Sequence, residues 1–271
     1  MKVAIGVVLY ETPQADFERW YASFEVAKSY TDVSFNVVVI DNSPDLVSRP
    51  PKESITQIPG RGNIGFGAGH NALIETSVSH GFDYYIGVNP DGFFHRYSLQ
   101  KILERVQREP SHLYEFRQFP LEHPKNYDIV TGETAWCSGA AFCFSAEAYR
   151  AVGGFDESFF MYCEDVDLSW RYRLHGRKCL VAQEALYYHS VANRDESELI
   201  SKRMLSSGVL LARKWRNTSF EKNCLRQLEH FKVAPPDEGV ANPLLFSSDE
   251  LAEASSFNGD FTFSDMRWRG I

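Results

Sequence analysis

GGFDESFFMYCEDVDL, the segment at residues 153–168, joins a glycine pair, an aromatic cluster and three carboxylates in one short stretch. The carboxylates fall where a helix is expected to begin, and apolar residues follow at Leu168, Trp170, Tyr172 and Leu174. An ordinary surface helix needs no aromatic wall in front of an acidic first turn. A site that holds a carboxylate beside a substrate does, because apolar walls raise the pKa of a carboxyl toward useful basicity. The segment therefore predicts a functional site.

The three carboxylates Glu164, Asp165 and Asp167 also have a plainer interpretation. Carboxylates in the first turn of a helix stabilise it by roughly 0.3–1 kcal/mol each through the helix dipole. Residues two apart on a helix point away from each other, so Asp165 and Asp167 cannot share one role. We expect Asp167 to anchor the helix or to pair with an arginine. Arg171 and Arg173 either meet a diphosphate or cover the helix surface.

The composition is that of one large folded domain, or of one domain with an extension. The chain has 271 residues, 44% of them hydrophobic and 14% aromatic, and its formal net charge is -8. An acidic balance without a long basic run argues against a nucleic-acid partner, which needs a broad phosphate-neutralising face. The five cysteines lack metal-ligand spacing, so we expect thiols in the core, a reducing cytoplasm and no structural zinc.

The first half of the chain alternates apolar runs with helical segments. Strands are expected at residues 3–9, 35–40, 55–58 and 84–88, and helices at residues 13–30 and after the glycine-rich residues 60–69. The first apolar run is too short for a membrane span and lacks the layout of a signal peptide. The alternation predicts a parallel sheet covered on both faces. Ligands bind beyond the carboxyl ends of such strands, which points to Tyr10, Asp41 and Asp91.

The second half is less regular. We expect an irregular segment at residues 109–124, a strand at 136–145 that enters the glycine pair, and helices at 164–175 and 197–215. From Pro235 onward the composition changes to Asp, Glu, Ser and Asn with scattered Phe. This tail is expected to be a loosely structured extension that packs against the same chain or a neighbouring one.

Candidate nucleotide-binding residues lie at the strand ends. Asp41 can accept the N–H of a uracil or thymine ring while Tyr10 stacks on the base, although a turn aspartate that caps the next segment is an equal alternative. Residues 60–71, GRGNIGFGAGHN, resemble a phosphate-cradling loop before a helix, but without Walker spacing, and a tight turn is as good an interpretation. Asp91, in Asn89-Pro90-Asp91, can hold a hard cation, and the same tetrapeptide with Gly92 is also an ordinary turn.

Taken in order, these motifs resemble those of family 2 glycosyltransferases, above all the rhamnosyltransferase-like branch. The resemblance runs from Met1 to about Trp215, through the strand-end Tyr10 and Asp41, the glycine loop, Asn89-Pro90-Asp91, the quoted segment and a late His189. It implies an α/β fold of the GT-A type, a three-layer α/β/α sandwich with a mostly parallel central sheet and a C-terminal extension. We expect residues 1–232 to form the GT-A domain and residues 233–271 the extension.

The resemblance also implies roles for single residues. Asp165 is the expected catalytic base, with Glu164 orienting it or contacting the acceptor. Asp91 and His189 are the expected ligands of a Mg²⁺ or Mn²⁺ ion, although a histidine after an apolar strand is more often a hydrogen-bonded core residue. Nucleotide binding is assigned to Tyr10, Asp41, Asn63, Gly65, Asn89 and Asp91, and acceptor binding to Trp136, Gly139 and Glu164. Trp136 and Gly139 fit a packed strand of small residues equally well.

The implied reaction is inverting transfer of a sugar, L-rhamnose as the first candidate, from a dTDP- or UDP-sugar to a saccharide hydroxyl. The acceptor is a saccharide or a lipid-linked saccharide of bacterial O-antigen or capsule. We expect a cytoplasmic protein that acts at the inner face of the cell membrane, with homo-oligomers or a partner subunit formed through the extension. One alternative is a catalytically silent sugar-nucleotide or glycan-binding module, which Asn89 in place of an aspartate favours. A nucleotidyltransferase is another, but residues 6–13 lack the activating lysine.

Overall fold

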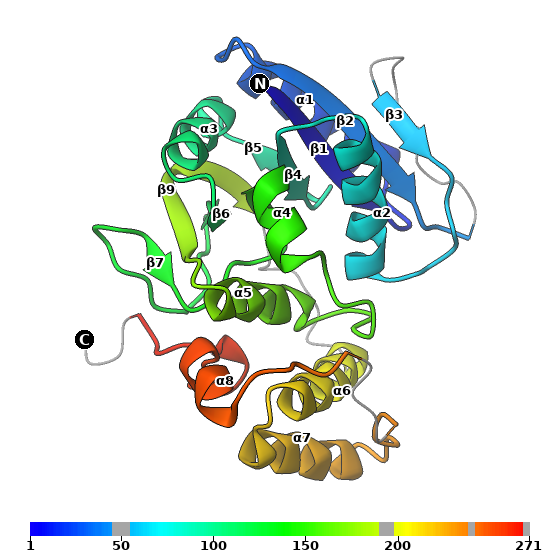
Figure 1. The fold of residues 1–271 in the computed structure, drawn as a ribbon. Coiled ribbons are helices and arrows are strands. Elements are labelled where there is room, and N and C mark those ends of the chain that lie inside the picture. The colour runs from blue at the N-terminus through cyan, green and yellow to red at the C-terminus, as the bar shows by residue number, and fades with distance from the viewer. Residues whose placement is uncertain (45–54, 190–197, 238–241, 268–271) are drawn as a thin grey trace.

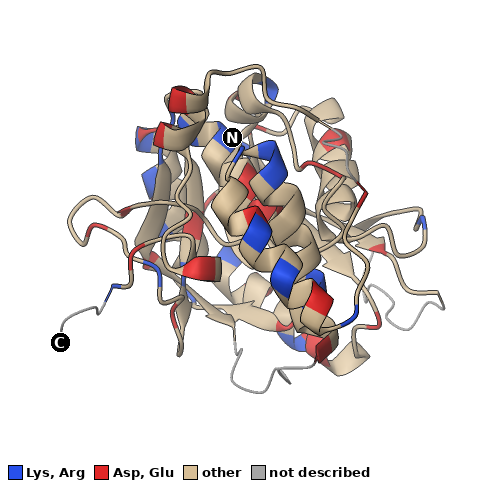
Figure 2. Ribbon diagram, turned by 90° about the horizontal axis from the view of Figure 1, so that it is seen from below, with Lys and Arg blue, Asp and Glu red and all other residues tan. Residues whose placement is uncertain are grey.

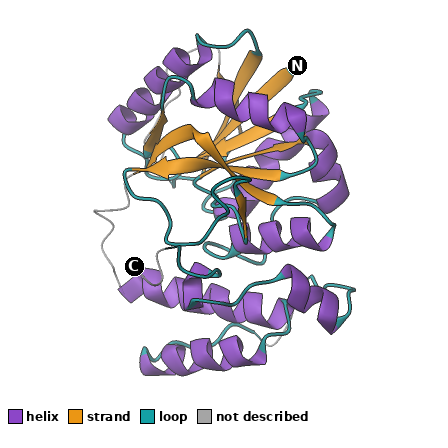
Figure 3. Ribbon diagram, turned by 90° about the vertical axis from the view of Figure 1, so that its left-hand side faces the viewer, coloured by secondary structure: helices purple, strands orange, loops and turns teal. Residues whose placement is uncertain are grey.

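The computed structural model describes residues 1–44, 55–189, 198–237 and 242–267. One sheet crosses the molecule between two layers of helices, and three further helices gather at one end, below α5 in Figure 1. Figure 3 shows the strands as a single layer with helices on either side. This arrangement confirms the predicted three-layer α/β/α sandwich.

The sheet is mixed, and most of its strands run in one direction. Its order is β3 (Ile55–Ile58), β2 (Ser34–Asp41), β1 (Lys2–Leu9), β4 (Tyr84–Val88), β8 (Ala141–Ser145), β6 (Leu113–Phe119), β9 (Cys179–His189) and β5 (Gly92–Phe94), with β7 (Glu133–Thr134) also on β9. Strands β3, β2, β1 and β4 are parallel to one another, and β6 is parallel to β9. Strand β8 is antiparallel to both β4 and β6, so six strands point one way and β5, β7 and β8 the other.

Two sets of helices cover the sheet. Helices α1 (Gln14–Lys28) and α3 (Ser98–Arg108) pack on one face, and α2 (Phe66–Ser79), α4 (Ala146–Val152) and α5 (Glu164–Leu174) on the other. The apolar run of β1 is buried on both sides, as expected of a strand between two helical layers. All five cysteines are free and buried, which confirms that their thiols serve as core groups.

The strand expected at residues 136–145 is shorter than predicted. Residues 136–140 are not a strand, and α4, which was not predicted, separates β8 from the glycine pair. The physical reason lies in the backbone N–H groups of three successive residues. They bond to side chains from elsewhere in the fold: Cys137 to Ser169 Oγ at 2.9 Å, Ser138 to Glu115 Oε2, and Gly139 to Asp165 Oδ2 at 2.9 Å. Their hydrogen-bonding needs are met without a neighbouring strand.

The C-terminal part is more ordered than expected. Helix α6 (Glu198–Lys214) was expected, whereas α7 (Thr218–His230) was not. Beyond Pro235 the chain forms α8 (Ser248–Ala254) and a 3₁₀ turn at Asp260–Thr262. Phe263 is 2% exposed, and its ring centroid lies 5.6 Å from that of Trp170 and 5.5 Å from that of Phe220. The scattered phenylalanines thus pack in one core with α5 and α7. The prediction of a loosely structured extension was therefore wrong. The structure shows the tail packed against its own chain, which was one of the two alternatives. Trp268, the last aromatic residue of the tail, lies outside the described residues.

Charge is distributed without a dominant sign at this end of the molecule. Figure 2 shows acidic and basic residues interspersed along the helices that face the viewer. Within residues 1–44, 55–189, 198–237 and 242–267, no helix combines the length and the apolar character that a membrane crossing requires.

His70 of α2 predicts a pH dependence of stability. Its ring is fully buried, Nδ1 lies 2.7 Å from the Tyr85 hydroxyl, and burial lowers its pKa to about 3. Below pH 6.5 the unfolded chain takes up a proton that the folded protein excludes, so the free energy of unfolding falls with falling pH. From pH 7 to pH 5 the loss due to His70 is about 2 kcal/mol.

Urea unfolding at both pH values should show a shallower pH dependence for His70→Gln than for the unmodified protein. The matched control is His80→Gln, which changes an exposed histidine at the end of the same helix. An equal slope for His70→Gln and the unmodified protein would contradict a neutral buried imidazole.

Candidate active site

The carboxyl edge of the parallel strands carries the predicted nucleotide-binding residues. Tyr10 and Asp41 lie side by side, because Leu9 is paired with Asp41 in the sheet. Tyr10 is exposed, as a stacking side chain requires, whereas Asp41 is buried and its Oδ1 accepts from the Ser43 backbone N–H at 3.0 Å. Asp41 Oδ2 has no hydrogen-bond partner among the described residues. The aspartate therefore both forms the local turn and keeps one acceptor atom unused.

The glycine-rich loop leads from this edge into α2. Gly65 has φ +89°, and a Cβ there would lie 2.3 Å from the carbonyl oxygen of Phe160. The Phe66 N–H also bonds to that oxygen at 3.1 Å. Gly65 is thus required for close packing against residues 153–163, while Asn63 is exposed on the preceding loop. Asn71 ties α2 to the same region, since its side chain bonds both backbone groups of Phe155 at 2.8 and 2.9 Å.

Asp91 and His189 meet although they are far apart in the sequence. His189 Nε2 lies 3.3 Å from Asp91 Oδ1 and 3.5 Å from Asn89 Nδ2. On the other side of the ring, His189 Nδ1 lies 3.1 Å from Gln118 Oε1. An amide oxygen only accepts, so Nδ1 carries the proton and Nε2 keeps its lone pair on the side of Asp91.

This pair fits a divalent cation. A carboxylate that is half exposed and an imidazole lone pair converge on one point, and the hydrogen bond to Gln118 fixes the tautomer in the way typical of metal-binding histidines. Among the described residues no three His, Cys, Asp or Glu side chains gather into a metal site. The described residues therefore offer two ligand side chains at this point, fewer than a hard cation usually takes.

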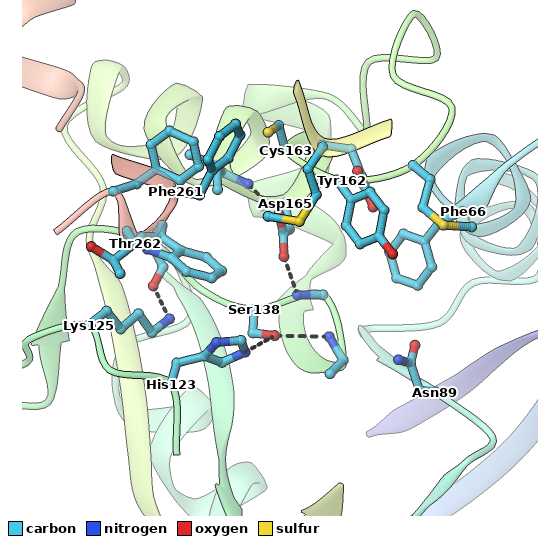
Figure 4. Close-up of a pocket in the computed structure, with 18 of the residues that line it drawn as sticks. Phe66, Asn89, His123, Lys125, Ser138, Tyr162, Cys163, Asp165, Phe261 and Thr262 are labelled. Carbon is cyan, nitrogen blue, oxygen red and sulfur yellow. Dashed lines mark hydrogen bonds between the residues drawn. The ribbon is translucent and has the colours of Figure 1, made fainter. Parts of the chain in front are cut away.

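A cavity of about 620 Å³ connects this cluster to α5. Figure 4 shows Asn89 at one side of the cavity and Asp165 above it, with Phe261 and Thr262 at the far side. The lining includes the four residues predicted for catalysis and acceptor binding, Trp136, Gly139, Glu164 and Asp165. It also includes Asn89, predicted to bind nucleotide, and His189, predicted to bind metal, whereas Asp91 is not part of it. Tyr10, Asp41, Asn63 and Gly65 do not line it and belong to the adjoining edge of the sheet.

Asp165 and Glu164 differ in their surroundings. Asp165 is partly exposed in the cavity wall, and its Oδ2 accepts from the Gly139 N–H at 2.9 Å. Burial raises its pKa, while the Gly139 N–H and the charge of Lys125 counteract that rise. Burial raises the pKa of Glu164 well above its ordinary value, the charge of Asp165 adds to this, and Glu164 Oε2 has no described partner. Burial thus raises the pKa of both carboxyls, and the Gly139 N–H and Lys125 counteract the rise at Asp165.

Asp167 confirms the expectation that it anchors its helix. Its carboxylate accepts from Arg171 Nε at 2.9 Å and from Trp215 Nε1 at 3.0 Å, and Lys214 Nζ lies 2.9 Å from its Oδ1. Lys214 Nζ also lies 2.6 Å from Asp156 Oδ2. We call Asp156, Asp167, Arg171, Lys214 and Trp215 the α5 anchor. Arg171 also donates to the Val152 carbonyl at 3.1 Å, so it fastens the glycine turn rather than meeting a diphosphate.

Several lining residues were not predicted. His123 Nε2 lies 3.2 Å from Ser138 Oγ, and Lys125 Nζ is buried against Glu115, 3.9 Å from the centre of the Trp136 ring. Trp136 donates its Nε1–H to the Thr262 carbonyl at 2.7 Å and is 6% exposed, which leaves little surface for stacking on a sugar. The only feature of the sequence that could have pointed to His123 was its position in the segment expected to be irregular, residues 109–124.

Comparison with solved structures identifies the class of fold. The chain resembles a mannosyltransferase from Pyrobaculum calidifontis in complex with GDP-Man and Mn²⁺, with a TM-score of 0.60, 16% identity and coverage of 93% of this chain and 73% of that one. For GalNAc-T7 with UDP, GalNAc and Mn²⁺ the TM-score is 0.64 at 9% identity, covering 94% and 54%. For TarS from S. aureus it is 0.58 at 14% identity, and the match spans 84% of this chain but 43% of TarS. The fold is that of GT-A glycosyltransferases.

Sequence similarity to curated proteins points to one group of glycosyltransferases. The chain is 25% identical over 209 residues to the rhamnosyltransferase WbbL of Escherichia coli K12, a match that covers 63% of this chain and 78% of that protein. It is 26% identical over 259 residues to the N-acetylglucosaminyl-diphospho-decaprenol L-rhamnosyltransferase of Mycobacterium tuberculosis, covering 76% and 83%. No family model matches. These similarities confirm the predicted resemblance to the rhamnosyltransferase-like glycosyltransferases.

Proposed function

We propose that this chain is an inverting glycosyltransferase of cell-surface polysaccharide synthesis. It transfers a sugar, L-rhamnose as the first candidate, from a dTDP- or UDP-sugar to a hydroxyl of a saccharide or lipid-linked saccharide. One observation carries the proposal. The Asp165 carboxylate, with its raised pKa, faces a cavity that Asn89 and His189 also line, at the carboxyl edge of the parallel strands. The similarity to rhamnosyltransferases supports the choice of L-rhamnose as the transferred sugar. We place the reaction at the cytoplasmic face of the membrane.

The chemistry is a single direct displacement. Asp165 accepts the proton of the acceptor hydroxyl as that oxygen forms a bond to the anomeric carbon. The bond from that carbon to the phosphate oxygen breaks, and its electron pair leaves with the nucleoside diphosphate. Because attack comes from the side opposite to the leaving group, the configuration inverts. The Gly139 N–H, 2.9 Å from Asp165 Oδ2, holds the carboxylate in place during this step.

Asp91 and His189 are the proposed ligands of a Mg²⁺ or Mn²⁺ ion. When bound, such an ion neutralises the charge that develops on the departing diphosphate. Asn89 orients the site, since its backbone N–H bonds to the Ala140 carbonyl at 2.9 Å and its side chain touches the His189 ring. Tyr10 and Asp41 are the proposed contacts of the nucleobase, and Asn63 and Gly65 of the glycine-rich loop are further proposed nucleotide-binding residues.

Calorimetric titration with dTDP, UDP and GDP, each with and without Mn²⁺, tests the proposal. We expect dTDP or UDP to bind with Mn²⁺, and Asp91→Ala to weaken that binding by at least roughly tenfold because one of two protein ligands is lost. The matched control is Asp83→Ala, which removes an exposed aspartate at the opposite end of β4. Binding that is equal with and without metal would indicate a metal-independent or silent site. No nucleotide binding at all would overturn the proposal.

A further inference from the structure

The C-terminal residues 261–267, which we call the strap, reach the catalytic cavity. Phe261, Thr262 and Phe263 are part of its lining. Figure 4 places Phe261 and Thr262 across the cavity from Asn89, on the side away from the proposed donor residues. The Trp136 side chain, which also lines the cavity, holds the strap there, because its Nε1 donates to the Thr262 carbonyl at 2.7 Å.

The strap also runs beside a second lining segment, residues 123–125. The Asn126 N–H bonds to the Asp265 carbonyl at 2.8 Å, and the Arg267 N–H to the Pro124 carbonyl at 3.0 Å. Lys125 and Met266 form an antiparallel bridge between these two hydrogen bonds. The strap therefore acts as a neighbouring strand for the segment that carries His123 into the cavity.

Side chains fasten the strap at its end. The Arg267 guanidinium pairs with the Glu122 carboxylate and lies 3.9 Å from the centre of the Tyr127 ring. Arg267 itself does not line the catalytic cavity. Its contacts hold the strap against residues 122–127, so it can influence the wall only through that packing.

We propose that the strap is the acceptor-binding wall of the cavity, with Phe261 and His123 contacting the acceptor saccharide. The inference rests on the proposed glycosyltransferase function and adds which residues bind the acceptor. An aromatic ring and an imidazole in the lining of one cavity suit a sugar, because one offers an apolar face and the other a hydrogen-bonding edge. Arg267 is a positioning residue. The extension beyond residue 232 is then required for acceptor binding and is not an appendage.

Two variants of the full chain test the strap. Phe261→Leu changes the lining, and Arg267→Ala loosens the strap outside the cavity. We expect each to raise the KM for acceptor roughly tenfold, and to leave the Kd for dTDP or UDP within about twofold, because the donor side is distant. Arg267→Lys, which keeps the ion pair to Glu122, should recover most of the acceptor KM. Lys178→Ala is the matched control, since it removes an exposed ion pair to Glu133 of β7.

Acceptor binding is also measured without turnover, by tryptophan fluorescence with a short-chain N-acetylglucosaminyl diphospholipid, the acceptor type in the name of the mycobacterial relatives. Weaker probe binding in both variants, with unchanged donor binding and melting temperature, supports the strap. Unchanged acceptor binding, or equal losses for donor and acceptor, overturns it, as does absence of probe binding by the unmodified protein. Failure of the proposed function has a different signature, namely no binding of dTDP or UDP and no transfer.

Discussion

Asp165→Asn is expected to lower kcat for sugar transfer by roughly 10²–10⁴-fold, the contribution typical of a general base. The amide cannot take the proton of the acceptor hydroxyl, while its oxygen can still accept from the Gly139 N–H. The cavity should therefore keep its shape, and the Kd for the donor nucleotide should stay close to that of the unmodified protein. Initial rates at saturating donor and acceptor, together with nucleotide calorimetry, measure both quantities.

The matched control is Glu164→Gln, which makes the same chemical change one residue earlier. Burial and the charge of Asp165 raise the pKa of Glu164 well above its ordinary value, which favours the neutral acid that the amide mimics. We expect a loss of less than about tenfold in kcat, well below that of a general base. Equal losses of kcat for both variants would indicate that Asp165 and Glu164 share the proton transfer. Full activity of Asp165→Asn would exclude Asp165 as the general base.

The pH profile provides an independent check. Burial raises the pKa of Asp165, so its basic form is lost at a higher pH than for an ordinary aspartate. The acid limb of kcat should accordingly lie above the usual range of an aspartate, and it should disappear from the residual activity of Asp165→Asn.

Local signals in the sequence were sufficient to predict the first four strands of the sheet. The continuous apolar runs predicted β1 to β4 with ends within one or two residues, because strands buried on both faces have few polar positions. Helix α3 was missed although Leu99, Ile102, Leu103 and Val106 have helical spacing and are buried. That signal was present in the sequence.

Other features depend on contacts between distant parts of the chain. Residues 137–139 look like a strand, yet their N–H groups bond to Ser169, Glu115 and Asp165, which no local pattern reveals. The strap and residues 122–127 lie at opposite ends of the second half, so the lining role of His123 depends on a pairing visible only in the fold. Asp165 could be predicted as a candidate because its aromatic and acidic neighbours are close to it in sequence, and it lines the cavity.

Lys214→Met is expected to destabilise the protein by about 3–5 kcal/mol, the cost of removing one partner from a buried ion pair. Its Nζ is the cation between Asp156 and Asp167, whose side chains are 3% and 0% exposed. Burial alone raises the pKa of Asp156, but the hydrogen bond and charge of Lys214 outweigh this and lower it to about 2. Without Lys214, Asp156 loses its main compensating charge. Urea unfolding at neutral pH measures the loss.

Acid titration and a double variant test the cause of that loss. In the unmodified protein the lowered pKa of Asp156 contributes stability that is complete above pH 3.8 and is lost as pH falls through about 2. Lys214→Met should lack this acid-dependent part, and Asp156→Asn combined with Lys214→Met should regain stability because no unpaired carboxylate remains at that position. A loss below about 1 kcal/mol, as for an exposed ion pair, would contradict the anchor. The α5 anchor holds Asp167 in the first turn of α5, two residues after Asp165, so we expect the loss of Lys214 to disturb the helix start that presents Asp165 to the cavity.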